Sequence, residues 1–104
     1  MAGLSDSVVG VEGLGGSGKV TIVALTASAW TALPTTALTN RNAIVIQNQS
    51  DNGNTVLLNY SASAAAEGMR LEDRGTKGLS LKESVIVYGR MASGTGTVAV
   101  EELA

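Results

Sequence analysis

The feature of this sequence that most restricts its fold is a series of short β-branched runs, separated by turn residues, from Lys19 onward. Several of these runs alternate apolar and polar positions, as strands with one buried face do. The clearest runs are residues 19–25, 43–47, 55–60 and 95–101, and weaker ones are residues 30–38, 68–72, 78–81 and 84–90. About six to eight short strands divided by frequent turns are typical of a sandwich or barrel. We therefore predict an all-β fold, a single small antiparallel β-sandwich or barrel that is jelly-roll-like.

Three connections carry more specific expectations. The pair Asn52-Gly53 favours a tight hairpin between the runs on either side, because both residues tolerate positive φ. Pro34 lacks an N–H donor, so its segment is predicted to be an edge strand or an extended connection. Residues 61–67 have helical propensity, but so short a segment forms one helical turn at most. Without longer helices, a parallel α/β sheet is not expected.

Residues 1–18 differ from the rest in being rich in glycine, which loses the most backbone entropy on ordering. We predict a flexible or extended N-terminal arm over residues 1–18 and a β-sandwich domain over residues 19–104. The apolar residues of the arm are the candidates for contact with a neighbouring molecule. They are Leu4, Val8, Val9, Val11 and Leu14.

The apolar stock of the chain consists mostly of small residues. The chain has 104 residues, of which 44% are hydrophobic and only 3% aromatic, with no Phe. Trp30, Tyr60 and Tyr88 are therefore predicted to be anchors, either in the core or in a subunit contact, where large rings bury the most area. A core this thin gains from burial against another copy of the chain, so a homo-oligomer is expected.

Composition also argues against most enzymes. The chain contains no His and no Cys, which removes the usual transition-metal ligands, the commonest general base and the thiol nucleophile. The formal net charge is −2 and no basic stripe is present, so nucleic acid is not the expected ligand. No apolar run approaches the roughly 20 residues of a membrane span. The start lacks the basic region of a secretory signal, so synthesis in a cytoplasm is expected. We expect no catalytic residues, no cofactor and no metal.

One glycine-rich motif resembles a phosphate-binding loop. The run from Gly13 to Lys19 satisfies G-x-x-x-x-G-K. The next position is Val20 rather than Ser or Thr, and the following run favours a strand where a phosphate loop opens a helix. A glycine-rich arm explains the same residues, and a phosphate-loop enzyme is the remote alternative.

Oxygen-bearing side chains offer two further motifs. Glu101 and Glu102 are adjacent, so on a strand they point to opposite faces and do not form a catalytic pair. The residues from Asp51 to Asn54 suit Ca²⁺ chemically, but a hairpin turn accounts for them as well.

The order of several segments resembles that of small tailed-bacteriophage virion proteins. The matching segments are the run from Trp30 to Asn48, Gly68-Met-Arg-Leu71, Leu79-Ser-Leu81, Val85-Ile-Val-Tyr88 and the run from Met91 to Glu101. The resemblance implies a β-sandwich or barrel module of the phage particle, commonly oligomeric and without catalytic residues. Residues 61–77 are longer and more charged than the corresponding family segment.

The resemblance leads to the expectation of a capsid decoration (cement) protein. Such a protein binds the outer head shell of the virion as a homo-oligomer, with a trimer expected here. Its expected partner is the major capsid protein or other virion proteins. The arm would lie on the shell or on a neighbouring subunit. The alternatives are a tail, neck or fibre-base component, and a host-glycan-binding module that uses an exposed Trp30.

Overall fold

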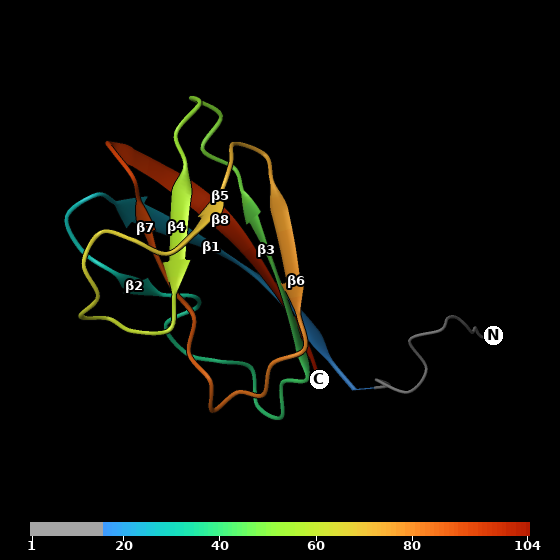
Figure 1. Ribbon diagram of the computed structural model, residues 1–104. Coiled ribbons are helices and arrows are strands. Elements are labelled where there is room, and N and C mark those ends of the chain that lie inside the picture. The colour runs from blue at the N-terminus through green and yellow to red at the C-terminus, as the bar shows by residue number, and fades with distance from the viewer. Residues whose placement is uncertain (1–15) are drawn as a thin grey trace.

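The structure is a computed structural model that describes residues 16–104, and this part of the chain forms eight strands and no helix (Figure 1). The strands are β1 (Gly18–Thr26), β2 (Thr31–Ala32), β3 (Ala43–Asn48), β4 (Val56–Asn59), β5 (Met69–Leu71), β6 (Thr76–Leu79), β7 (Tyr88–Met91) and β8 (Thr95–Leu103). The all-β prediction is confirmed. Residues 61–67 contain turns and no helical turn.

The eight strands form two four-stranded antiparallel sheets, with orders β1-β8-β3-β6 and β2-β7-β4-β5. The chain changes sheet at every connection except the one from β4 to β5. The first and last strands, β1 and β8, pair along their whole length and lie side by side in Figure 1. Two four-stranded sheets wound in this way are a jelly roll, as the sequence predicts.

The predicted hairpin around Asn52-Gly53 is wrong. The turn itself is present, and Gly53 has a φ of 78°. However, β3 pairs with β6 and β8, whereas β4 pairs with β5 and β7, so the turn carries the chain from one sheet to the other. Turn residues fix where a chain reverses, but the partners of a strand in a jelly roll come from distant parts of the sequence.

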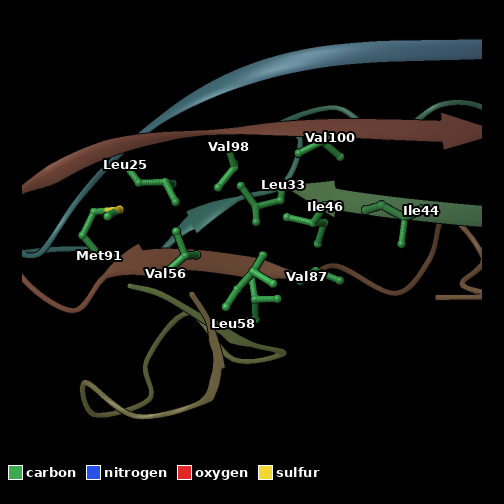
Figure 2. Close-up of a cluster of buried hydrophobic side chains, with 11 residues drawn as sticks. Leu25, Leu33, Ile44, Ile46, Val56, Leu58, Val87, Met91, Val98 and Val100 are labelled. Carbon is green, nitrogen blue, oxygen red and sulfur yellow. The ribbon is translucent and has the colours of Figure 1, made fainter. Parts of the chain in front are cut away.

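The core lies between the two sheets and consists of aliphatic side chains (Figure 2). It comprises Leu25, Leu33, Ile44, Ile46, Val56, Leu58, Leu71, Val87, Met91, Val98 and Val100. Ile44 and Ile46 of β3 and Val98 and Val100 of β8 alternate with outward residues, as expected for strands buried on one face. In Figure 2 these side chains face those of the opposite sheet, such as Val56.

Two weak strand predictions are corrected in detail. Only the end of residues 84–90 is a strand: β7 begins at Tyr88, and Val85 and Ile86 are exposed in the preceding connection. The Val85 carbonyl accepts a hydrogen bond from Arg41 and so is not free for a ladder. Within residues 30–38 the strand is the two-residue β2, which lies at a sheet edge and ends before Pro34, as predicted.

Candidate interaction surface

The side of the β1-β8-β3-β6 sheet that faces away from the core is largely apolar. We call this side the outer face and define it by the outward positions of β1, β8 and β3. They are Val20, Ile22, Ala24, Thr97, Ala99, Glu101, Leu103, Ala43, Val45 and Gln47. Val20 is 63% exposed and Ile22 is 59% exposed, the highest values among the exposed large hydrophobic residues of the described chain.

The strand register places a single carboxylate within this apolar surface. Glu101 lies between Val20 of β1 and Val45 of β3, and the next row contains Ile22 and Ala99. No cation lies among the residues that define the outer face. Large contiguous apolar surface on a folded domain is a mark of an interaction site.

The edge of the same sheet is open at β1. Over its nine residues β1 pairs continuously with β8, without a bulge, and no other strand of residues 16–104 pairs with its second side. Edge strands are usually protected by charges, Pro residues or bulges. β1 contains only Lys19 as a charged residue and no Pro. No strand of the described chain pairs with the outward backbone groups of β1, so they can accept another strand.

The outward side of the other sheet is covered by the protein's own chain. Leu57 of β4 is only 4% exposed although it alternates with the core residues Val56 and Leu58 and so points away from the core. The segment that joins β4 to β5 lies on this side of the molecule (Figure 1). It is held by Trp30, whose Nε1 donates to the Ala64 carbonyl at 2.9 Å.

Two further contacts fix this covering segment. The guanidinium carbon of Arg90 lies 5.6 Å from the centre of the Trp30 ring, a cation–π geometry, and Arg90 also donates to the Ala27 carbonyl. At Gly68 the segment returns so close to β4 that a Cβ there would lie 2.3 Å from the Leu58 carbonyl oxygen. Only glycine fits at this close approach.

A buried ion pair closes one end of the sandwich. Arg41 Nη1 lies 3.0 Å from Glu102 Oε2, and the two side chains are 2% and 0% exposed. Arg41 Nη2 also donates to the carbonyls of Lys82 and Val85, and the Leu38 amide donates to Glu102 Oε2 at 2.9 Å. Together these bonds tie two long connections to the end of β8. Sequence reasoning missed this pair, since the two residues lie 61 positions apart.

The adjacent glutamates therefore have opposite environments, as the strand periodicity predicts. Glu101 is exposed on the outer face, whereas Glu102 points inward and is buried. They share no cleft. Glu102 is instead a structural residue, held by Arg41.

The loop proposed as a calcium alternative is occupied by its own hydrogen bonds. Asp73 accepts from the backbone amides of Asp51 and Gly53 at 3.0 and 3.2 Å, and Arg74 pairs with Asp51. The hydrogen bond to Asp51 and the nearby negative charges raise the pKa of Arg74 above its usual value. Within residues 16–104 no three His, Cys, Asp or Glu side chains gather in a way that could hold a metal ion.

The motif that resembles a phosphate loop ends in a strand. Gly18 and Lys19 are the first residues of β1, so no helix N-terminus faces a bound anion there. Gly13 and Gly15 lie outside the described residues.

The three predicted aromatic anchors all lie outside the core cluster. Trp30 and Tyr88 are half-buried, and Tyr60 is 56% exposed. Trp30 anchors the segment between β4 and β5, as described above. The predicted role of the aromatic residues in a subunit contact stays a prediction. The arm residues Leu4, Val8, Val9, Val11 and Leu14 lie outside the described residues.

A small apolar pocket opens where the edges of β5 and β6 leave the sandwich uncovered. Its volume is about 230 Å³, and its lining includes Leu58, Tyr60, Met69, Leu79 and Val87, with Lys77 as the charged side chain. No carboxylate accompanies Lys77 in this lining.

Comparison with protein-family models, curated proteins and solved structures gave no match to this chain. In the part of the chain that the structure describes, no helix is long and apolar enough to cross a membrane. The class that the fold and surface define is thus a small jelly-roll module with one covered outer side and one apolar outer face.

Proposed function

We propose that this protein is a non-enzymatic structural subunit of a bacteriophage virion. In this role it acts as a capsid decoration protein that binds the outer head shell and associates with copies of itself. The observation that carries the proposal is the apolar outer face bordered by the open edge of β1, with Val20 and Ile22 more than half exposed. A surface of this kind is stabilised when another protein covers it.

Two further observations support a structural role. Eight-stranded jelly rolls are a recurrent architecture of viral capsid proteins, which supports the proposal by analogy of fold only. The best-buried charged groups of the described chain, Arg41 and Glu102, serve to hold two connections to the end of β8. The segment resemblance to phage virion proteins agrees with both observations.

Decoration of a shell requires only a low affinity from each single contact. Many copies on a symmetric lattice each contribute modest affinity, and simultaneous contacts multiply it. In this proposal the part of the glycine-rich arm that precedes Ser17 contacts the shell or a neighbouring subunit, and its ordering cost is offset by the contacts it gains. The major capsid protein is the proposed partner.

Quantitative gel densitometry of purified virions tests this function. A decoration protein should be present in an amount comparable to that of the major capsid protein. A much smaller amount, near that of the tail proteins, would favour the tail, neck or fibre-base alternative. Complete absence from purified particles would contradict any role in the virion.

Recognition of host glycans is a weaker alternative. Its candidate residue, Trp30, already uses its Nε1–H for the Ala64 carbonyl and one ring face for Arg90. A sugar would have to compete with both contacts. Titration of the protein with host-surface glycans should therefore show no binding that depends on Trp30.

A further inference from the structure

We propose that two copies of this chain join edge to edge through β1, antiparallel about a two-fold axis at Ile22, to form one continuous eight-stranded sheet. This inference rests on the self-association in the proposed function and names the surface that carries it. The order of the extended sheet would be β6-β3-β8-β1 followed by β1-β8-β3-β6 of the second copy.

The lengths of the four sheet edges favour β1 as the contact. β1 offers nine residues, whereas the other edge strands, β6, β5 and β2, offer four, three and two. The number of backbone hydrogen bonds across a new strand pair rises with its length. β1 also has the regular, unbulged geometry that pairing requires, since its ladder with β8 has no interruption.

The sequence of β1 is self-complementary in this arrangement. Ile22 is the central residue of Gly18–Thr26, so a two-fold axis there places it opposite Ile22 of the second copy. Val20 then lies opposite Ala24, and Lys19 lies opposite Leu25. Every outward side chain near the axis meets an apolar one, and the two lysines stay six residues apart along the strands, roughly 20 Å.

Exposure is concentrated at the same place. Val20 and Ile22 are the two most exposed of the large hydrophobic residues that the structure shows at the surface, and both point to the outer face from this edge strand. Pairing through β1 brings each of them against a flanking side chain of the second copy. The outer faces of the two copies then join into one wider apolar surface.

The position of Glu101 argues against the simpler alternative of stacking two outer faces on each other. In that arrangement the Glu101 carboxylate, between Val20 and Val45, would be buried with no cation on either outer face. A buried, unpaired charge is strongly unfavourable. Edge pairing leaves Glu101 on the neighbouring strand, β8, and exposed to solvent.

Cysteine cross-linking of the full-length chain tests the axis directly. The natural chain contains no cysteine, so one introduced cysteine can form a disulfide only with the same position of another copy. We expect Ile22→Cys to give a covalent dimer under mild oxidation. The matched control is Thr76→Cys, an exposed position on β6, the opposite edge of the same sheet, and it should cross-link at least tenfold more slowly.

Charge pairing at the axis gives a second readout. Ile22→Lys and Ile22→Asp should each sediment as monomers, because each places like charges opposite each other. An equimolar mixture of the two should sediment as a dimer. Ile22 is 59% exposed, so both variants should keep the circular dichroism spectrum of the natural chain.

Two results would overturn the inference. One is a natural chain that stays monomeric at high concentration. The other is an oligomer, a trimer included, in which the Ile22→Cys variant does not form its intermolecular disulfide faster than the control. Either result, with abundant protein in the virion, would leave binding to the head shell intact, and a strictly monomeric chain would also remove self-association from the proposed function. A disulfide-linked Ile22→Cys dimer of a protein missing from virions would contradict the function and leave the edge contact standing.

Discussion

The two sheets of this sandwich differ in whether the chain itself covers their outward sides. On the β2-β7-β4-β5 sheet the chain covers itself: Trp30 and Gly68 fix the segment between β4 and β5, and Leu57 is buried although it points outward from this sheet. On the β1-β8-β3-β6 sheet the outward side keeps Val20 and Ile22 at the surface. The same kind of apolar side chain is thus protected within the molecule on one side and available to another molecule on the other.

This difference separates residues that stabilise the fold from residues that offer a contact. Stability should depend on the core and on the covered side, because those side chains lose their contacts with water on folding. Substitutions at Val20 and Ile22 should change the free energy of unfolding little, since both side chains stay more than half exposed in the folded chain. The following substitutions test that division, from the largest expected effect to the smallest.

The largest effect on the free energy of unfolding is expected at the buried pair of Arg41 and Glu102, on the core side of β8. Arg41→Ala removes the partner of a buried carboxylate and three backbone contacts, so it should lower the free energy of unfolding by about 3 to 5 kcal/mol. Urea denaturation followed by circular dichroism measures this loss. Arg74→Ala, which breaks the exposed pair with Asp51, is the matched control and should leave the unfolding midpoint unchanged. Equal effects of the two variants would refute the structural role of Arg41.

A smaller effect is expected on the covered side. If Trp30 were fully buried, Trp30→Ala would lower the free energy of unfolding by about 3 to 5 kcal/mol. Trp30 is half-buried, so we expect Trp30→Ala to lower it by less, about 2 kcal/mol. Trp30→Phe keeps an aromatic ring and loses the Nε1–H donor to Ala64, at a cost of about 1 kcal/mol.

Hydrogen exchange shows where the Trp30 variants act. Trp30→Ala should speed amide exchange in residues 60–68 and at Leu57, because the covering segment loses its anchor. Exchange in β1 and β8 should stay as slow as in the natural chain. Faster exchange across both sheets would mean that Trp30 supports the whole sandwich.

The smallest effect is expected on the outer face. Val20→Thr keeps the β-branched shape at a position that is 63% exposed, so it should change the free energy of unfolding by less than about 0.5 kcal/mol. Val98→Thr makes the same change in the core, where the hydroxyl is buried, and should cost about 1 to 3 kcal/mol. Both variants are compared by thermal melting of dilute protein. A large loss from Val20→Thr would show that the outer face contributes to folding.

The sequence predicts the strands well because their signal is local. β1 and β8 carry their β-branched residues and alternation in nine residues each. The partners of a strand are not local, and this is why the pair Asn52-Gly53 predicts a hairpin that the fold does not contain. In a jelly roll the same turn chemistry serves a crossing between sheets.

The interaction surface could be predicted only in part. Alternation in β1 indicates that Val20, Ile22 and Ala24 share a face, but it does not say which face is buried or that β1 lies at an edge. Pairing with β8, from the other end of the chain, decides both. The partnership of Arg41 with Glu102 is equally non-local. Size alone predicts the aromatic residues as anchors, yet aliphatic residues supply the core.

The pairing of the first and last strands gives the sandwich two distinct ends, one beside Ala104 and one at the turn that contains Gly53. Ser17 and Ala104 exchange backbone hydrogen bonds, so the segment that precedes the domain attaches beside its C-terminus. The turn at Gly53, where added atoms meet open space, contacts the start of β8 through a hydrogen bond from Asn52 to Thr95. The start of β8 lies a strand length, roughly 27 Å, from the end of β8 next to Ala104. A foreign epitope inserted at that turn would project from the end of the sandwich opposite to a tag joined at Ala104, which makes the module an oriented display scaffold.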